Sequence, residues 1–230
     1  MQTIKCQVVA LEALTDTVFQ VFLKPEKPLH QQAGQYLMMV LGDDDRRPFS
    51  IASKPANELI ELHIGAFVAE SYAMQVIAHL RSHEHVTIEA PAGQAVLRQQ
   101  STNPRILVAG GTGFSYIHAL VAELIANQDK QPTYLYWGCR DAAGMYLRQQ
   151  AEMMAQQHSP LTFIPVFDEA VAGERHGSVI DAVCQDFKTL APYDIYVAGR
   201  FEMARIAKTR FLAQGALDKQ LIGDAFSYLT

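Results

Sequence analysis

The sequence predicts two successive domains, a small antiparallel β-barrel with one helix and then an open parallel α/β sheet with helices on both faces. Two patterns predict this. Residues 3–93 form short β-rich segments separated by turn residues. From residue 105 onward, apolar runs alternate with segments of helical periodicity, which is typical of right-handed βαβ units. A length of 230 residues also suits two domains of about 100 residues each.

Six strands and one helix are predicted for the first domain. The strands are expected at residues 4–13, 17–23, 34–41, 47–53, 59–66 and 86–90. In the fifth, Ile60, Leu62 and Ile64 alternate with Glu61, His63 and Gly65, as in a strand with one buried face. A helix is expected at 70–80, where Ala73, Val76, Ile77 and Leu80 share a face. Six short strands favour a barrel, because closure removes exposed sheet edges.

The second domain begins with the apolar run 106–109, which indicates a parallel strand buried on both faces. The next segment carries a helical apolar stripe made of Ile117, Leu120, Val121, Leu124 and Ile125. Further strands are expected at 133–137, 161–166 and 194–198, and helices at 145–157, 179–187 and 202–212. The polar stretch 99–104 ends in a proline, so we expect domains at 1–100 and 104–230.

Composition excludes several classes of protein. Apolar residues make up 49% and charged residues 19%, as in an ordinary globular protein. The net charge of −5 and the lack of a basic patch argue against nucleic acid or an anionic membrane as a partner. The N-terminus is too polar for a signal peptide, and no apolar run approaches about 18 residues.

Cysteine and histidine spacing predicts neither a disulfide framework nor a metal site. Cys6, Cys139 and Cys184 are odd in number and far apart, which favours a reducing cytoplasm. The cluster of His79, His83 and His85 straddles the end of a predicted helix and is expected at the surface.

A glycine-rich turn joins the first parallel strand to its helix, with the sequence Gly110-Gly111-Thr112-Gly113-Phe114-Ser115. Glycine lets the chain turn sharply and lets backbone N–H groups approach a ligand, and a helix N-terminus favours a pyrophosphate. The turn departs from the G-x-G-x-x-G fingerprint, since Tyr116 replaces the third glycine, and it lacks the lysine of a P-loop. A simple tight turn is the alternative, but its position at the first βα junction favours a nucleotide site.

The turn after the last parallel strand, Ala198-Gly199-Arg200-Phe201-Glu202-Met203, should face the same crevice. Gly199 would leave room there for a flat ring to approach the backbone, whereas the alternative is again a simple turn.

The segment Arg47-Pro48-Phe49-Ser50 lies in a β context. Arg47 offers a bidentate fork for phosphate, and Ser50 a hydroxyl that can donate to a ring nitrogen. Pro48 fixes φ and removes one donor. These residue types alone do not predict flavin, because such an arginine is usually solvated and Phe49 suits a core.

The chain as a whole resembles the flavin-reductase branch of the ferredoxin–NADP reductase superfamily. The likeness rests on several segments in the same order, at residues 33–37, 47–53, 61–66, 109–116, 134–138, 194–204 and 223–228. One departure is residues 91–96, where the family more often has His, Glu and Trp, so that loop is assigned no role beyond shaping the barrel's mouth.

The resemblance implies transfer of a hydride from NADH or NADPH to a flavin, with Ser50 near the reactive N5 as the catalytic residue. The implied flavin-binding residues are Tyr36, Arg47, Pro48, Phe49, Ser50, His63, Ile64 and Gly65. Those implied for the nicotinamide nucleotide are Gly110, Gly111, Thr112, Gly113, Phe114, Ser115, Arg140, Gly199, Arg200, Phe201, Met203 and Phe226, with Tyr228 beside them. Such transfer needs no strong acid or base from the protein and no metal, which fits the absence of a nucleophile–base motif.

The flavin is expected to bind weakly, as a substrate that leaves reduced. Relatives that hold FAD firmly have a Gly-and-Ser phosphate loop before the barrel helix, where this chain has residues 66–72 with no glycine and with Glu70. A carboxylate there would repel a pyrophosphate. Riboflavin, FMN or FAD would then serve. On the donor side, Arg140 suits a 2′-phosphate while Asp141 suits a free ribose, so both NADH and NADPH are expected.

Two other functions are compatible with the same fold. A reductase component with bound flavin, serving an oxygenase or luciferase partner, would usually add iron–sulfur cysteines. A non-enzymatic flavin-binding module would be expected to lose Gly111, Thr112 or Gly113, and all three are present. A monooxygenase, a luciferase or a ferric complex could each consume the reduced flavin, and the oligomeric state is open.

Overall fold

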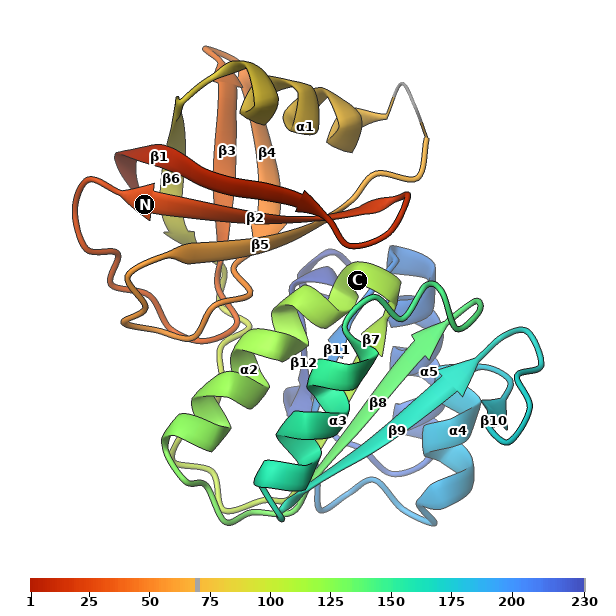
Figure 1. Cartoon of the computed structure of the whole chain (residues 1–230). Helices are drawn as coiled ribbons and strands as arrows, with labels where there is room; N and C mark the ends of the chain where they lie inside the picture. The colour runs from red at the N-terminus through yellow and green to blue at the C-terminus, as the bar shows by residue number, and fades with distance from the viewer. Residues whose placement is uncertain (69–70, 230) are drawn as a thin grey trace. The chain divides into compact units, whose positions relative to one another are not determined.

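The chain is described here by a computed structural model that covers residues 1–68 and 71–229 (Figure 1). It divides into two compact units. Unit 1 comprises Met1–Leu97 and His118–Glu123, and unit 2 comprises Arg98–Ile117 and Leu124–Thr230. The assignment of flavin binding to residues 1–100 and nucleotide binding to residues 104–230 concerns ligands and stays a prediction.

Unit 1 is built on a six-stranded antiparallel sheet in the order β4-β3-β6-β1-β2-β5. Its strands are β1 (Gln2–Ala13), β2 (Val18–Pro25), β3 (Tyr36–Gly42), β4 (Asp45–Ser50), β5 (Ile60–Gly65) and β6 (His85–Ala92). The sheet curls so that its edges meet beyond β4, where the amide of Ala52 donates to the carbonyl of Glu61 in β5 (2.7 Å). The predicted barrel is therefore confirmed as a half-barrel.

The core of unit 1 follows the predicted alternation, with Ile60, Leu62 and Ile64 buried in the sheet's inner face. Helix α1 (Tyr72–Ser82) covers one end of the curled sheet. It begins two residues later than expected because Ser71 caps it, its hydroxyl accepting a hydrogen bond from the Met74 amide (3.2 Å).

Unit 2 contains a six-stranded sheet in the order β10-β9-β8-β7-β11-β12, with every pair parallel. Its strands are β7 (Arg105–Gly110), β8 (Thr133–Cys139), β9 (Leu161–Phe167), β10 (Arg175–His176), β11 (Asp194–Ala198) and β12 (Leu221–Ile222). The four predicted strands are confirmed. The two edge strands, β10 and β12, were not predicted because two residues carry no readable periodicity.

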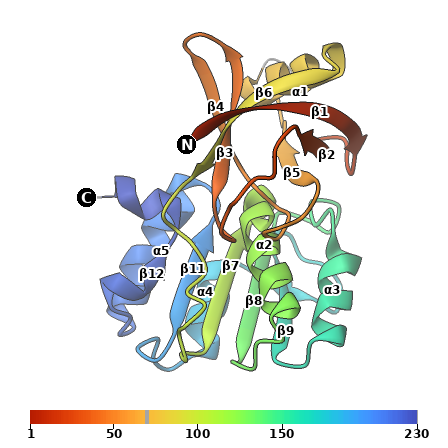
Figure 2. The same cartoon turned by 90° about the vertical axis from the view of Figure 1, so that its left-hand side faces the viewer.

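The helices of this half of the chain are α2 (Phe114–Ala126), α3 (Arg148–Gln157), α4 (Val179–Asp186) and α5 (Phe201–Ala213), with 3₁₀ turns η1 (Gly111–Gly113), η2 (Asp218–Gln220) and η3 (Asp224–Tyr228). Helix α3 lies with α2 on one face of the sheet, and α4 and α5 lie on the other (Figures 1 and 2). The middle of α2, His118–Glu123, belongs to unit 1.

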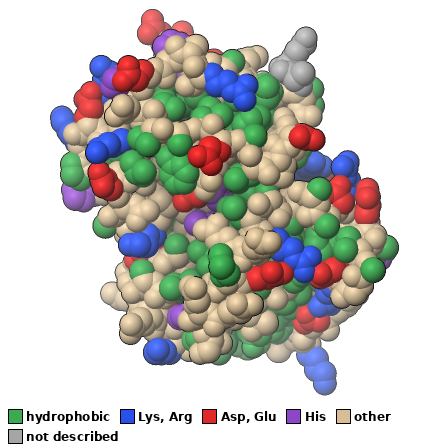
Figure 3. All heavy atoms as spheres, viewed as in Figure 1, with side chains coloured by type: hydrophobic (Ala, Val, Ile, Leu, Met, Phe, Trp, Pro, Cys, Tyr) green, Lys and Arg blue, Asp and Glu red, His purple; other side chains and the backbone are tan. Residues whose placement is uncertain are grey.

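The charges on the surface and the lengths of the helices are those of an ordinary globular protein. Basic and acidic side chains are interspersed on the face shown in Figure 3, in keeping with the net charge of −5. Among residues 1–68 and 71–229, no helix is long and apolar enough to cross a membrane.

Candidate functional site

Ser50, Tyr36 and Pro48 share one face of the sheet in unit 1. Ser50 ends β4 and lies directly across from Tyr36, which begins β3. Side chains alternate along a strand, so Pro48 lies on the same face as Ser50. A proline is accommodated because β4 is an edge strand. The structure thus brings together three of the residues predicted to line the flavin.

Arg47 and Phe49 lie on the opposite face of β4. Phe49 packs against the apolar core, and Arg47 is only 6% exposed. The Arg47 guanidinium forms a bidentate pair with Asp45, from Nε to Oδ1 (2.7 Å) and from Nη2 to Oδ2 (2.5 Å). It also donates to the Tyr72 carbonyl (2.6 Å) and to Gln75 Oε1 (2.6 Å) in α1.

This pairing occupies the guanidinium that was expected to offer a fork to a phosphate. Four of the five N–H groups of a guanidinium are used by these contacts. The fork expected to receive a phosphate is paired with Asp45, a residue to which the sequence assigned no role. Residues two apart on a strand share a face, which is why the pair forms. The hydrogen bond from Arg47 lowers the pKa of Asp45, so the pair is ionic.

The residues of β5 that were predicted to lie near the flavin have different surroundings from those of β4. The Ile64 side chain is fully buried in the core of unit 1, and its expected place beside the flavin stays a prediction. The His63 side chain is also fully buried, with Nε2 2.9 Å from Glu61 Oε1. Gly65 ends the strand, opposite Val18 of β2.

Glu61 and His63 belong to a buried polar cluster that the sequence analysis missed. Its third member is His118 of α2, which is 4% exposed and whose Nδ1 is 2.8 Å from the Ala52 carbonyl. The His63 and His118 rings meet edge to face, with centroids 5.5 Å apart. Gln20 donates to Glu61 Oε1 (2.6 Å). The sequence signal for this cluster is His118 itself, a polar residue that directly follows Ile117 of the apolar helical stripe.

Two groups of the cluster have pKa values that their surroundings lower. Burial alone would raise the pKa of Glu61, but hydrogen bonds from His63 and Gln20 and the nearby imidazoles outweigh it and lower that pKa. Burial lowers the pKa of His118. Because a carbonyl only accepts, the His118 tautomer must carry its proton on Nδ1 and donate it to Ala52.

In unit 2, each glycine of the turn after β7 has its own geometric cause. Gly111 has φ +53°, a conformation that favours glycine, and a Cβ there would meet nothing within 4 Å, so the space above it is open. A Cβ on Gly113 would lie 2.2 Å from the Ala198 carbonyl oxygen. A Cβ on Gly110 would lie 2.5 Å from the sulfur of Met203.

The turn after β11 meets the turn after β7. A Cβ on Gly199 would lie 3.4 Å from the Cα of Gly110 and 2.7 Å from the Cε of Met203. Strand β7 has β8 on one side and β11 on the other, so the chain order reverses between β7 and β11. Ligands of open α/β sheets bind in the crevice at such a point. Part of the room expected beside Gly199 is filled by Met203.

An aromatic brace supports the glycine-rich turn. The rings of Phe114 and Trp137 stack with centroids 3.8 Å apart and an interplanar angle of 8°, and Trp137 Nε1 donates to the Gly111 carbonyl (2.9 Å). Phe114 is fully buried and Ser115 is 3% exposed, so their side chains shape the turn and only their backbone could face a nucleotide. Trp137 was predicted only as part of a strand.

The other residues predicted for the nucleotide site are largely exposed. Arg200 precedes α5, and Phe201 is 60% exposed with its ring edge to face with Tyr228 (6.0 Å). Phe226 is half-buried against the core of unit 2.

Arg140 follows β8 and is predicted to select the nicotinamide nucleotide. Its side chain is 77% exposed and is shared by two carboxylates, Asp141 (3.1 Å) and Glu169 (3.6 Å). The Glu169 amide also donates to the Arg140 carbonyl (2.8 Å), which fixes the two loops together.

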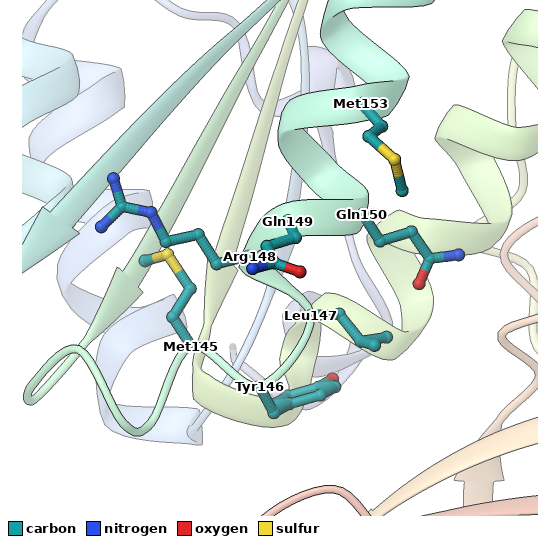
Figure 4. A pocket seen from close by; sticks show the side chains of 7 residues that line it. All are labelled: Met145, Tyr146, Leu147, Arg148, Gln149, Gln150 and Met153. Atoms are coloured by element: carbon teal, nitrogen blue, oxygen red, sulfur yellow. The ribbon is translucent and has the colours of Figure 1, made fainter.

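A pocket of about 540 Å³ lies at the start of α3 (Figure 4). Its lining is Met145, Tyr146, Leu147, Arg148, Gln149, Gln150 and Met153. Arg148 points away from the side on which Gln150 and Met153 lie, and it pairs with Glu152 and Glu174. None of the predicted site residues lines this pocket, but Tyr146 contacts both rings of the aromatic brace edge to face.

Comparison with known proteins gives matches over the whole chain. Residues 107–209 match the family of oxidoreductase NAD-binding domains. The chain is 43% identical to the NAD(P)H-flavin reductase of Aliivibrio fischeri, over 98% of this chain and 99% of that protein. It is 40% identical to the NAD(P)H-flavin reductase of Vibrio harveyi, over 99% and 100%. A ferredoxin NADP⁺ reductase from Neisseria gonorrhoeae, solved with bound FAD and NADP, has the same fold, with a TM-score of 0.83 at 12% identity over 97% and 98%.

Proposed function

The chain belongs to the NAD(P)H-flavin reductase family, and we propose that it transfers a hydride from NADH or NADPH to a free flavin, which leaves reduced. The nicotinamide and the flavin ring supply the redox chemistry, and the protein binds and orients them. Transfer requires the reacting atoms to approach to about 3–3.5 Å, so the contribution of the chain is placement.

The observation that carries the nucleotide half of the proposal is the meeting of two glycine turns at the switch point of the parallel sheet. Gly110 and Gly199 touch there, and the space above Gly111 is open. Helix α2 begins directly after this turn, and its positive end favours a pyrophosphate.

For the flavin half, the facing pair of Ser50 and Tyr36 supplies hydroxyl groups on one face of the half-barrel. We assign Ser50 to the flavin N5, where its hydroxyl would donate a hydrogen bond to the atom that accepts the hydride. Pro48, two residues before it, removes one competing backbone donor.

We propose that flavin binds as a substrate and not as a resident group. Arg47 is the cation of the predicted flavin seat, and it is bound by Asp45 and by α1, so it offers little to a phosphate. Glu70, the second reason for this proposal, lies outside the described residues. A flavin held by its ring and ribityl chain alone would dissociate readily, and riboflavin, FMN and FAD would all serve.

Both nicotinamide nucleotides are proposed as donors. Arg140 can bind a 2′-phosphate, but Asp141 and Glu169 already compete for its guanidinium.

The reduced flavin would then pass to a consumer such as a monooxygenase, a luciferase or a ferric complex. Three free thiols support a cytoplasmic location.

The test is an assay of purified protein with NADH or NADPH and excess riboflavin, followed by the loss of nicotinamide absorbance. We expect oxidation that depends on both protein and flavin. Oxidation no faster than in the flavin-free control would refute the proposed function. Protein that stays yellow after desalting would refute the substrate role of flavin and would favour a reductase component with bound flavin.

A further inference from the structure

The segment that follows Ser50 is buried and is held by two backbone hydrogen bonds. Ile51, Ala52 and Ser53 are at most 3% exposed. The Ile51 amide donates to the Gln35 carbonyl (3.1 Å), and the Ala52 amide donates to the Glu61 carbonyl (2.7 Å). Both bonds fix the chain immediately after the residue assigned to the flavin N5.

The remaining contacts on this segment come from side chains. The hydroxyl of Ser53 accepts from the Glu61 amide (3.1 Å), and the Ser53 carbonyl accepts from Gln31 Nε2 (3.3 Å). The Ala52 carbonyl accepts from His118 Nδ1 (2.8 Å). A buried carbonyl without a partner is unfavourable, so we expect the chain to shift if His118 cannot donate.

The His118 ring is itself positioned by His63 and Glu61. Its ring packs against the edge of His63, which is fixed by Glu61. Glu61 lies in β5, and its backbone bonds both Ala52 and Ser53. The cluster therefore holds Ala52 twice, through the Glu61 carbonyl and through the His118 imidazole, and holds Ser53 through the Glu61 amide. No step of hydride transfer uses these groups chemically.

We propose that His118, supported by His63 and Glu61, is a positioning residue that fixes the backbone after Ser50 and thereby sets the rate of hydride transfer to the flavin. This inference rests on the proposed function. It predicts that the donor atom matters more than the presence of a polar group, because only a donor at the Nδ1 position reaches the Ala52 carbonyl.

The experiment compares His118→Asn, His118→Gln and His118→Ala with wild type, because an asparagine amide replaces Nδ1 and a glutamine amide replaces Nε2. We expect kcat/KM for riboflavin to fall about tenfold in H118A and H118Q, which equals about 1.4 kcal/mol. H118N should recover most of the loss. The KM for NADH should change less than about twofold, and the isotope effect with deuterated NADH should rise because hydride transfer becomes more limiting.

Substitutions of His63 provide a second test with the opposite expected order, since His63 donates to Glu61 from Nε2 and not from Nδ1. There H63Q should recover activity and H63N should not. His79→Ala on α1 is the matched control, and it should leave all constants unchanged.

Equal activity of H118N and H118Q, an unchanged flavin kcat/KM in H118A, or a parallel rise in the KM for NADH would each overturn the proposal. If H118A does not fold, the comparison of H118N with H118Q still decides. Wild-type protein that does not oxidise NADH with riboflavin refutes the proposed function instead, so the two failures are distinguishable.

Discussion

Ser50 is the side chain on which the proposed chemistry depends most directly. We expect Ser50→Ala to slow hydride transfer to riboflavin about tenfold, the effect of losing one hydrogen bond of about 1.4 kcal/mol. The KM for NADH should stay unchanged, because the substitution removes no contact with the nucleotide. Single-turnover reduction of flavin measures the first quantity and steady-state kinetics the second. Ser82→Ala, at the exposed end of α1, is the control. A raised KM for NADH with an unchanged rate would contradict the placement of Ser50.

Arg140 and Glu169 should have opposite effects on the choice of nucleotide. Removing the cation in Arg140→Gln is expected to lower kcat/KM for NADPH about two- to fivefold and to leave NADH nearly unchanged, a modest effect because the side chain is exposed. Glu169→Gln frees Arg140 from one carboxylate and should raise kcat/KM for NADPH. Both effects should shrink in high salt. If the two variants change the NADPH to NADH ratio in the same direction, Arg140 does not contact the 2′-phosphate.

Residue types predicted some side-chain positions and missed others for a physical reason. Ser50 and Tyr36 were expected in one site only because of the family resemblance, and the strand pairing sets them opposite each other. The ionic partner of Arg47 was missed because Asp45 sits in a run of three acidic residues that is equally typical of a turn. His118 was missed because its partner Ala52 is 66 residues away, and a hydrogen bond to a carbonyl leaves no pattern in the sequence.

Among the elements, the glycine turns give the sharpest prediction. In Gly113→Ala the added Cβ would lie 2.2 Å from a main-chain carbonyl oxygen, which cannot move away as a side chain could. We expect the free energy of unfolding to fall by about 1–3 kcal/mol or more, and the KM for NADH to rise. Urea unfolding and steady-state kinetics are the measurements.

Gly42→Ala is the matched control for this change, because a Cβ there meets nothing within 4 Å. Equal stabilities of the two variants would show that the turn after β7 yields more easily than its contacts indicate.

Long periodic elements were predicted well, and their ends less so. The alternation in β5 and the stripe of α2 fixed those elements, since both patterns repeat several times. The strand expected at 47–53 ends at Ser50, because the Ile51 amide bonds to Gln35 and residues 52 and 53 bond to β5 and α2 instead. The helix expected from residue 145 begins at Arg148, after a turn in which the Arg148 amide donates to the Met145 carbonyl (3.0 Å).

At the scale of the whole molecule, stability should fall in acid. The pKa of His118 is lowered by burial from an ordinary value of 6.5, and that of Glu61 is lowered from 4.5 by its hydrogen bonds against the effect of burial. Both shifts make the unfolded chain bind more protons than the folded one, so stability rises with pH. The contribution of His118 is complete above pH 6.5 and is lost as the pH falls toward its folded value, and that of Glu61 is lost below pH 4.5.

The measurement is urea unfolding of wild type and His118→Asn between pH 8 and pH 5. The loss of stability on acidification should be smaller in the variant, which has no imidazole to protonate in the unfolded state. The comparison at pH 8, where His118 is neutral in both states, gives the pH-independent cost of the substitution. Equal slopes in the two proteins would mean that His118 is not buried as a neutral group.

The sulfur end of Met203 occupies the space that side chains on Gly110 and Gly199 would fill. Two neighbouring turns are thus spaced by one unbranched, adaptable thioether in place of two rigid methyl groups. Replacing either glycine would disturb a turn itself, whereas a substitution at position 203 would reset the separation of both turns together. We therefore expect a substitution at Met203, a helix residue outside both turns, to change the width of the crevice between them.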